Sequence, residues 1–368
     1  MNKDSKIYIA GHTGLVGSAL YWQLEAEGYT NLITRTHTEL NLERQADVEG
    51  FFDKEKPEYV FLAAAKVGGI WANKTYPAQF IYNNLVIQTN VIHSAWKLGA
   101  KRLLFLGSSC IYPRECPQPM REEYFLTGPL EVTNEPYAVA KIAGVEMCQS
   151  YNRQYGTDFV SVMPTNLYGP NDNFDLETSH VLAAFIRKFH LAKLAVQGDW
   201  ESIQKDEAHY GPIPDYVLTS LASISELHGH GSSVLSAYGL VPSKAQPAVV
   251  LWGSGRPHRE FLHVDDLAGG CIFLMSQEEK KLRSLLTADR LPLINIGWGK
   301  DISIEELAIL IKKTVGFDGD IVFDTTKPDG TPQKLLDVAR MAELGWKAKI
   351  TLKDGISQVY RWYLENSR

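Results

Sequence analysis

Three glycines at intervals of three residues stand between the first apolar run of the chain and its first helical pattern. Gly11, Gly14 and Gly17 follow a predicted strand at 6–10 and precede a predicted helix at 16–27. This spacing allows a tight turn, a close approach of the backbone to a pyrophosphate, and close packing of the helix on the strand. The helix N-terminus adds N–H groups and partial positive charge. The loop therefore predicts a dinucleotide-binding unit, and the alternative is a turn with a structural role alone.

The alternation of strand and helix continues through the first half of the chain. Strands are predicted at 31–34, 58–64, 102–107 and 159–164, and helices at 78–98 and 137–155. Strands that alternate with helices form parallel sheets with helices on both faces. We therefore expect an α/β fold, with a Rossmann-type doubly wound parallel sheet and a smaller C-terminal α/β substrate domain.

The rhythm changes in the second half of the chain. The dinucleotide-binding domain is expected in residues 1–172, with some later segments returning to it, and the substrate domain mainly in residues 173–368. Residues 196–247 are rich in Ser, His, Gly and Pro and break the alternation. We interpret them as an insertion with a short helix near 216–226, not as a separate domain.

Charge and cysteine content exclude several kinds of partner. Lys and Arg number 37 against 43 Asp and Glu, for a net charge of −6, and the basic residues are scattered. No nucleic-acid partner is therefore expected. The longest apolar stretches, such as 59–65, have the length of strands, so neither a signal peptide nor a membrane partner is expected. The 4 cysteines lack metal-ligand spacing, which favours a cytoplasmic protein with reduced thiols.

Other conspicuous residues are assigned no chemistry. The pair His228 and His230 suggests a metal, but no further ligand stands at helical spacing around it, so no metal is expected. Three of the cysteines and the aromatic residues of the last predicted helix fall in loops or apolar patterns. Structural roles are expected for Cys116, Cys148, Cys271, Tyr360, Trp362 and Tyr363.

The residues after the second predicted strand indicate which dinucleotide is bound. An acid there usually holds a ribose 2′-hydroxyl, whereas Arg accommodates a 2′-phosphate. Here Arg35 and His37 follow the strand, and no acid occurs before Glu39. This pattern favours NADP(H) over NAD(H). The alternative is that Arg35 is a solvated surface charge.

A serine, a tyrosine and a lysine are placed to act on a carbonyl group. Ser108 follows the strand at 102–107, at the sheet edge where ligands of such folds bind. Tyr137 and Lys141 are one helical turn apart and share a face. An ammonium near a phenol lowers the pKa of the phenol toward a range useful for proton transfer. The set suits hydride transfer, in which nicotinamide supplies the hydride and Tyr137 the proton.

Together these elements resemble the extended short-chain dehydrogenase/reductases, and within them the family of GDP-L-fucose synthases. The resemblance covers nearly the whole chain except 196–247. It is carried by long motifs in family order at 62–70, 106–113, 134–144, 163–170, 252–255, 259–266, 327–332 and 334–337.

The resemblance implies a reaction and two further catalytic residues. The implied reaction is the NADPH-dependent 3,5-epimerisation and 4-reduction of GDP-4-keto-6-deoxy-D-mannose to GDP-L-fucose. Family roles as base and acid fall on Cys110 and His180, because the C4 ketone acidifies the neighbouring protons and a thiolate or imidazole works near neutral pH. From the residues alone, a buried inert thiol and an ordinary helix-start histidine are the alternatives.

The cofactor and substrate contacts are expected at the ends of successive strands. Cofactor contacts expected besides the glycines and the residues named above are His12, Thr13, Leu15, Val16, Ala63, Ala64, Lys66, Leu106 and Gly107. The resemblance adds Pro164, Thr165, Asn166, Leu167 and His180 to the cofactor site. Substrate contacts are expected at Ser108, Ser109 and Cys110, and by resemblance at Asn166, Lys188, Trp252, Arg259 and Asp329.

Two departures from the family pattern bear on specificity. Thr13 and His37 stand where the family often has basic residues, which leaves Arg35 as the main candidate for a 2′-phosphate contact. The segment 196–247 is several times longer than the usual family connection. We hypothesise that it borders the nucleotide-sugar pocket or adds to an oligomer contact.

Alternative functions and an oligomeric state complete the expectations. Two alternative activities are compatible with the same fold. One is an enzyme that acts on a related nucleotide sugar, such as a GDP-heptose, and the other is a reductase without epimerase activity. A non-catalytic NADP sensor is a different class, and the complete Ser108, Tyr137 and Lys141 set argues against it. By resemblance, a homodimer is expected to form through the helices at 78–98 and 137–155.

Overall fold

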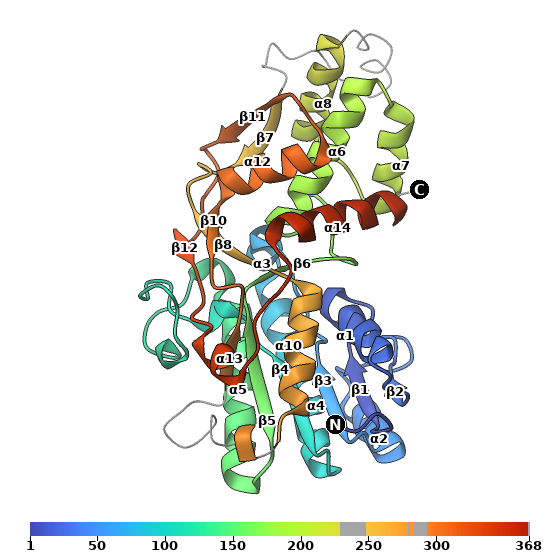
Figure 1. Ribbon diagram of the computed structural model, residues 1–368, viewed down its shortest axis with the longest axis vertical. Coiled ribbons are helices and arrows are strands. Elements are labelled where there is room, and N and C mark those ends of the chain that lie inside the picture. The colour runs from blue at the N-terminus through green and yellow to red at the C-terminus, as the bar shows by residue number, and fades with distance from the viewer. Residues whose placement is uncertain (229–247, 279, 283–292, 367–368) are drawn as a thin grey trace. The chain divides into compact units, whose positions relative to one another are not determined.

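The computed structural model describes residues 1–228, 248–278, 280–282 and 293–366 (Figure 1). The contact pattern divides the chain into two compact units, each built from three stretches of sequence. The first unit comprises residues 1–171, 260–301 and 334–350. The second unit comprises residues 172–259, 302–333 and 351–368.

A parallel sheet forms the centre of the first unit. Among the described residues it is six-stranded, in the order β2-β1-β3-β4-β5-β9, and adjacent strands pair in parallel. The strands are β1 (Ile7–Ala10), β2 (Leu32–Ile33), β3 (Tyr59–Leu62), β4 (Arg102–Leu106), β5 (Phe159–Pro164) and β9 (Leu293–Ile296). The chain runs from β1 outward to β2 and then returns to β3 on the other side of β1, which makes the edge between β1 and β3 a topological switch point.

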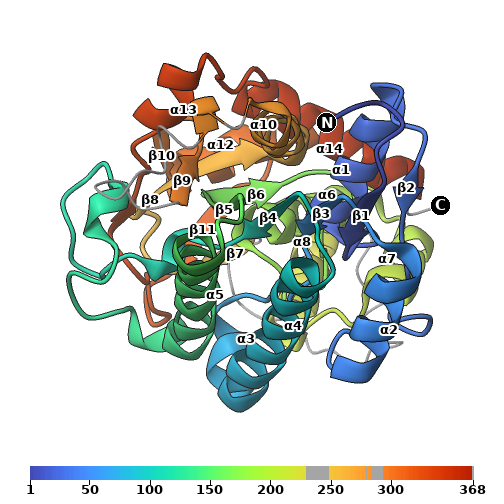
Figure 2. The same cartoon turned by 90° about the horizontal axis from the view of Figure 1, so that it is seen from below.

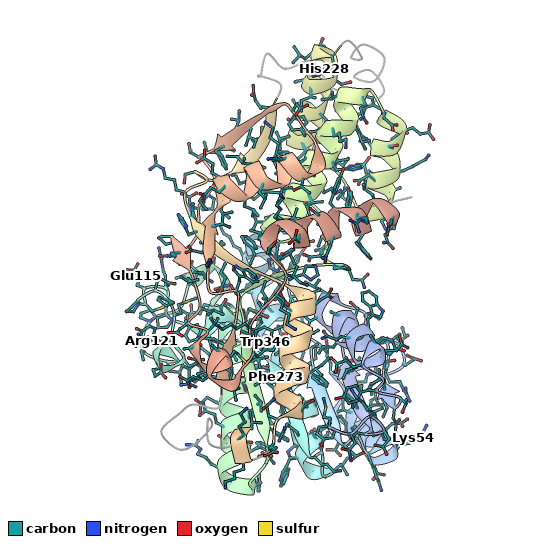
Figure 3. All side chains as sticks on the ribbon, in the orientation of Figure 1. Lys54, Glu115, Arg121, His228, Phe273 and Trp346 are labelled. Carbon is teal, nitrogen blue, oxygen red and sulfur yellow. The ribbon has the colours of Figure 1, made fainter. Side chains whose placement is uncertain are left out.

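Helices cover both faces of this sheet, as Figure 2 shows. One face carries α2 (Gln45–Glu55), α4 (Pro77–Lys97) and α5 (Glu135–Tyr155). The other carries α1 (Leu15–Ala26), α10 (Val264–Ser276) and α13 (Ala339–Leu344), with Phe273 on α10 and Trp346 packed beside Gly270 of the same helix (Figure 3). Because both faces are covered, the strands are apolar along almost their whole length. The predicted doubly wound α/β fold is confirmed.

Short elements complete the first unit. The helix α3 (Ile70–Thr75) precedes α4, and a short 3₁₀ turn, Ser109–Ile111, follows β4. The strand β6 (Asn166–Tyr168) pairs in parallel with the second half of β8 (His258–His263).

The second unit is mainly helical. The helix α6 (Val181–Gln197) packs against α7 (Trp200–Tyr210), α8 (Asp215–Leu227) and α12 (Ile304–Val315), and α12 also contacts α14 (Leu352–Asn366). Two strands, β7 (Ala248–Trp252) and β11 (Asp320–Asp324), pair in parallel. Ser303 and Glu306 form a reciprocal capping box at the start of α12. The short strands β10 (Asp301–Ser303) and β12 (Gln333–Lys334) fall where the chain passes between the units.

The described part of the segment 196–247 is tied into the core of the second unit. Its expected helix is α8, and the C-cap residue His228 that follows this helix is labelled in Figure 3, whereas α7 was not anticipated. Arg187 of α6 is 0% exposed, and its Nε donates to Asp206 of α7 over 2.7 Å. Its other N–H groups donate to the carbonyl oxygens of Phe174, Tyr210 and Gly211. A buried guanidinium with its donors satisfied locks α7 onto α6.

Candidate active site

The glycine loop has the shape that its spacing predicts. Gly11 has a φ of +86°, and a Cβ there would lie 2.7 Å from the backbone nitrogen of Ala64. A Cβ on Gly17 would lie 2.0 Å from the carbonyl oxygen of Gly11, so no side chain fits at this position. The backbone N–H of Gly14 donates to the same oxygen over 3.1 Å, and α1 begins directly after it. The loop therefore presents bare backbone and a helix N-terminus beside the switch point of the sheet.

The loop also fits a bound dinucleotide in its polar chemistry. His12 is half-buried, and its Nδ1 is a buried atom with no hydrogen-bond partner among the residues that the structure describes. Thr13 and Gly14 are exposed. An unpartnered buried nitrogen in a phosphate-binding loop is explained by a ligand that supplies its partner.

Arg35 lies just beyond β2 and is already engaged. Its guanidinium binds Glu55 over 2.8 Å and the carbonyl oxygen of Thr34 over 2.7 Å. The guanidinium also lies 5.6 Å from the centre of the Phe51 ring. Because arginine carries five N–H donors, these contacts are compatible with a phosphate contact as well. The side chain of His37 is exposed.

The other expected cofactor residues lie at the carboxyl ends of β3, β4 and β5. Lys66 follows β3, and its backbone N–H donates to Asn84 Oδ1 over 2.9 Å. Gly107 follows β4, and a Cβ there would lie 2.2 Å from Met163. Small residues are therefore needed at this edge. Also in this set are the half-buried Ala63 and Ala64, the buried Leu106 and Pro164, and the half-buried Leu167.

A buried glutamate that the sequence analysis did not single out organises the segment after β5. The carbonyl oxygen of Glu260 accepts hydrogen bonds from Thr165 Oγ1 at 3.2 Å and Asn166 Nδ2 at 2.8 Å. Its carboxylate accepts the backbone N–H groups of Gly299 at 2.6 Å and Leu336 at 2.9 Å. Glu260 therefore joins three segments that are far apart in the sequence. The available signal was a glutamate directly before the apolar pair Phe261 and Leu262, since a carboxylate is rarely buried without partners.

The predicted catalytic serine, tyrosine and lysine come together in the first unit. Ser108 directly follows Gly107, and its hydroxyl forms a hydrogen bond with Tyr137 of α5. Lys141 Nζ donates to the carbonyl oxygen of Leu106 over 2.7 Å and lies 5.7 Å from the Tyr137 ring centre. Phe80 packs edge-on against the Tyr137 ring, with the ring centres 6.1 Å apart.

Burial decides the protonation of this group. It raises the pKa of Tyr137, and the neighbouring Cys110 adds to this, while the hydrogen bond from Ser108 opposes it. Burial lowers the pKa of Lys141 to about 8. The sequence predicts that Lys141 lowers the pKa of Tyr137, whereas in the structure burial raises it. The phenol is thus a proton donor that keeps its proton until a strong base forms beside it.

Cys110 lies two residues after Ser108 in the same cluster. The thiol is buried, and its backbone N–H donates to Ser108 Oγ over 3.3 Å. Burial raises the pKa of Cys110, whereas Lys334, the Ser108 hydroxyl and Lys141 oppose the shift. The two cations are the groups that favour a thiolate at this position. Ser109, also an expected substrate contact, is buried.

His180 belongs to the second unit. It is the N-terminal cap residue of α6, and its carbonyl oxygen accepts from the backbone N–H of Ala184 over 3.0 Å. The imidazole makes no capping hydrogen bond and is exposed. Its ring is therefore not committed to holding the helix end.

Two of the expected substrate residues, Lys188 and Trp252, lie beside the same tyrosine ring in the second unit. Lys188 is 6% exposed, its Nζ donates to the carbonyl oxygen of Val250 over 3.2 Å, and burial lowers its pKa to about 8. Trp252 ends β7 and is 44% exposed. The ring of Tyr216, from α8, lies between them, 5.0 Å from Lys188 Nζ and 6.0 Å from the Trp252 ring. Tyr216 was not predicted as a site residue. Its place in the hydrophobic periodicity indicates a helix but gives no information about the side chains that its ring contacts.

Asp329 and Arg259 lie near the turn that follows Trp252. Asp329 accepts from the backbone N–H of Ser254 at 2.6 Å and from its hydroxyl at 2.8 Å. These bonds lower the pKa of Asp329, with smaller contributions from Arg256 and Arg259. Arg259 Nη1 donates to the carbonyl oxygen of His258 over 2.8 Å. The aspartate therefore shapes the turn at 252–255 and stays ionised.

The structure places the residues assigned structural roles in packed surroundings. Cys148 and Cys271 are buried free thiols, and Cys116 is half-buried. Tyr363 is buried and stacks on Tyr210, with ring centres 4.8 Å apart, and Tyr360 is buried as well. Trp362 stacks on Phe174.

In the described part of the chain, no group of three or more His, Cys, Asp or Glu side chains is arranged to hold a metal ion. His230, from the motif considered for a metal, lies outside the described residues. No described helix combines the length and the apolar character that crossing a membrane requires.

A glycine-rich loop at a sheet switch point, followed by a Ser, Tyr and Lys cluster at the same edge, defines a class of nicotinamide-dependent enzymes that act on carbonyl and hydroxyl carbons. The chain belongs to the NAD dependent epimerase/dehydratase family, which it matches over residues 7–204 and 219–286. The predicted resemblance is thereby confirmed.

Within this family, the chain is similar to enzymes that act on GDP-linked sugars. A GDP-L-fucose synthase of Arabidopsis thaliana is 51% identical, over 99% of this chain and 95% of that protein. The GDP-L-fucose synthase of Escherichia coli K12 is 48% identical, over 98% of this chain and 97% of that protein. A GDP-D-glycero-L-gluco-heptose synthase of Campylobacter jejuni, solved in the presence of NADPH, is 42% identical with a TM-score of 0.83, over 99% of both chains.

Proposed function

We propose that this chain converts GDP-4-keto-6-deoxy-D-mannose to GDP-L-fucose, by epimerising C3 and C5 and reducing C4 with NADPH. The observation that carries the proposal is the cluster of Ser108, Tyr137 and Lys141 with Cys110 beside it, in a chain 51% and 48% identical to two GDP-L-fucose synthases. Residues 1–172 are assigned the dinucleotide and residues 173–368 mainly the sugar nucleotide.

The reduction uses the buried phenol as its acid. NADPH, when bound, supplies a hydride to C4 of the sugar. The carbonyl electron pair moves to the C4 oxygen, which Ser108 holds and to which Tyr137 gives its proton. The resulting phenolate is stabilised by the Lys141 ammonium and recovers a proton from solvent. The raised pKa of Tyr137 suits this order, because the phenol releases its proton only when negative charge builds on the C4 oxygen.

The epimerisations use a second acid–base pair. The C4 ketone makes the C3 and C5 protons removable, and Cys110 as thiolate takes one of them to leave an enolate. His180 as imidazolium returns a proton to the other face of the same carbon, and that centre is inverted. The thiol then gives its proton to solvent and the imidazole takes one from solvent before the second centre reacts. Lys334 and Lys141 counteract the burial that otherwise keeps Cys110 protonated.

The cofactor preference rests on Arg35. Its guanidinium has donors for the 2′-phosphate while it keeps the ion pair with Glu55. The bare loop at Gly11, Gly14 and Gly17 takes the pyrophosphate, and His12, whose Nδ1 has no hydrogen-bond partner among the described residues, belongs to the same loop. The residues therefore fit NADP(H).

A second candidate substrate is a GDP-heptose. The observation that favours it is the 42% identity to the Campylobacter jejuni GDP-D-glycero-L-gluco-heptose synthase across 99% of both chains. The same residues would perform the same chemistry, and the two candidates differ in the group at C6.

Isotope exchange tests the proposal directly. Purified protein is incubated with GDP-4-keto-6-deoxy-mannose in deuterium oxide, with and without NADPH. We expect deuterium at C3 and C5 without NADPH, and GDP-L-fucose once NADPH is added. Oxidation of NADPH without exchange would leave a 4-reductase. The absence of both deuterium exchange and NADPH oxidation would indicate a different sugar nucleotide, such as a GDP-heptose.

The proposal includes a cytoplasmic homodimer. Helices α4 and α5 pack against each other, and Tyr82 of α4 is 62% exposed, with Val139 of α5 also exposed. Large exposed apolar side chains on neighbouring helices suit an isologous four-helix interface. Sedimentation analysis of the wild type and of Tyr82→Asp tests it, and a monomeric wild type would contradict it.

A further inference from the structure

Tyr216 links two residues of the second unit that the proposed function assigns to the sugar nucleotide. Its half-buried ring lies 5.0 Å from Lys188 Nζ, and its ring centre lies 6.0 Å from that of Trp252, with the planes inclined by 36°. Tyr216 and Trp252 also share a side-chain hydrogen bond. Since the indole N–H can only donate, the phenolic oxygen accepts it.

The position of Tyr216 is fixed by the packing of α8 on β7. Val217 and Leu221 of α8 are buried, and Ser220 of the same helix donates a hydrogen bond to the carbonyl oxygen of Ala248 in β7. A small pocket between α8 and β7 is lined by both Tyr216 and Lys188. The tyrosine therefore reaches Lys188 and Trp252 from a firmly seated helix.

The surroundings suit a planar base that carries phosphates. Trp252 ends β7 with 44% of its surface exposed, and Lys327 Nζ lies 5.3 Å over its ring. Aromatic faces bind nucleobases by stacking, and ammonium groups bind phosphate as point charges. Lys188 supplies such a group, although it is held by Val250 and by the Tyr216 ring.

We propose that Tyr216 is a positioning residue for the nucleoside diphosphate of the substrate, by orienting the Trp252 indole through a hydrogen bond and the Lys188 ammonium through its ring. This inference rests on the proposed function, because it requires that the chain binds a guanosine diphosphate sugar. It gives the described part of the segment 196–247 a role in substrate recognition.

Binding of GDP measured by calorimetry tests the inference without any sugar. Tyr216→Phe retains the ring beside Lys188 but loses the hydroxyl, and Tyr216→Leu loses the aromatic face while keeping an apolar side chain. We expect GDP to bind about fivefold more weakly to Y216F and about tenfold or more weakly to Y216L. NADPH binding should stay within about twofold in both variants.

Kinetics separate a positioning role from a purely structural one. In both variants KM for the sugar nucleotide should rise by the same factor as the GDP dissociation constant, with little change in kcat. Thr219→Ala, on the same helix, is the matched control, because the Thr219 hydroxyl donates to the backbone carbonyl oxygen of Asp215 and its own carbonyl oxygen, which accepts from Ser223, is kept in the variant. It should bind GDP like the wild type. Wild-type GDP affinity and KM in folded Y216F and Y216L would overturn the inference. Failure of the wild type itself to bind GDP would instead overturn the proposed function.

Discussion

Lys141 of α5 donates a hydrogen bond of 2.7 Å to the carbonyl oxygen of Leu106, the last residue of β4. The bond fixes the ammonium at the end of the strand that leads into Ser108. The position of the cation beside the Tyr137 ring therefore depends on the sheet as well as on the helix.

Replacing Lys141 should remove both the anchor and the charge. We expect Lys141→Met to lower kcat for NADPH oxidation by at least about a hundredfold, because the Tyr137 phenolate loses its stabilising cation. The measurement is the decrease of NADPH absorbance at saturating substrate. A kcat within about threefold of the wild type would show that the cation plays no part in the proton transfer.

The pH dependence of kcat should report the same lysine. Burial lowers the pKa of Lys141 to about 8, so the ammonium is present below that pH and is lost above it. We therefore expect kcat to fall as pH rises through about 8. Lys141→Arg, although slower, should not show this fall, because arginine stays protonated. Lys188 has a similarly lowered pKa, and its titration would change KM for the substrate. The rate must therefore be measured at saturating substrate, where it reports kcat alone.

Two substitutions should separate epimerisation from reduction. Tyr137→Phe should lower NADPH oxidation by about a hundredfold or more while deuterium exchange at C3 and C5 continues without NADPH. Cys110→Ala should abolish that exchange, since its thiol is the proposed base. Mass spectrometry of the recovered sugar nucleotide gives the deuterium content.

Cys116→Ala is the control for this pair, because Cys116 is a half-buried thiol outside the cluster. It should exchange like the wild type. Exchange that survives in the Cys110 variant would remove the thiol from the mechanism.

Substitutions of Arg35 and of its ion-pair partner Glu55 should change KM for NADPH in opposite directions. Arg35→Ala should raise KM for NADPH about tenfold while KM for NADH changes less than about twofold. Glu55→Gln should lower KM for NADPH about threefold, because the guanidinium then has no carboxylate competing with the phosphate. Steady-state kinetics with both cofactors measures this. Equal changes for NADPH and NADH would place the 2′-phosphate contact elsewhere.

The buried ion pair of the second unit should dominate its stability. Arg187→Met leaves the buried Asp206 carboxylate without its cationic partner and should lower the free energy of unfolding by about 3–5 kcal/mol. Lys205→Ala removes an exposed ion pair with Glu201 and should change it by less than about 1 kcal/mol. Urea unfolding of both variants gives the comparison, and equal effects would contradict the assignment.

The sequence predicts those features of the fold that depend on local pattern. Gly11 and Gly17 are recognisable because only a residue without a side chain fits there, and the buried strands are recognisable because both faces are apolar. Ser108, Tyr137 and Lys141 follow from their positions at a strand end and on one helix face. The start of α5 at Glu135, two residues before the prediction, reflects helix ends that periodicity defines poorly.

What the sequence does not predict depends on tertiary contacts. The helix α7 was missed because its stability comes from Arg187 and Tyr363, which reach Asp206 from α6 and α14. The pKa of Tyr137 was expected to fall, and it rises because burial, aided by Cys110, outweighs the hydrogen bond from Ser108. Glu260 and Tyr216 carry no motif of their own, and their roles appear only through the backbone groups and rings that they contact.

The order of strands in the sheet has a consequence for synthesis on the ribosome. The strand β5 pairs with β4 on one side and with β9 on the other, and β9 belongs to a much later stretch of the chain. While the intervening residues are being made, the outer edge of β5 exposes unpaired backbone N–H and C=O groups. An apolar strand with an open edge is a template for pairing with another nascent chain. Aggregation during expression should therefore be most sensitive to substitutions that delay the arrival of β9.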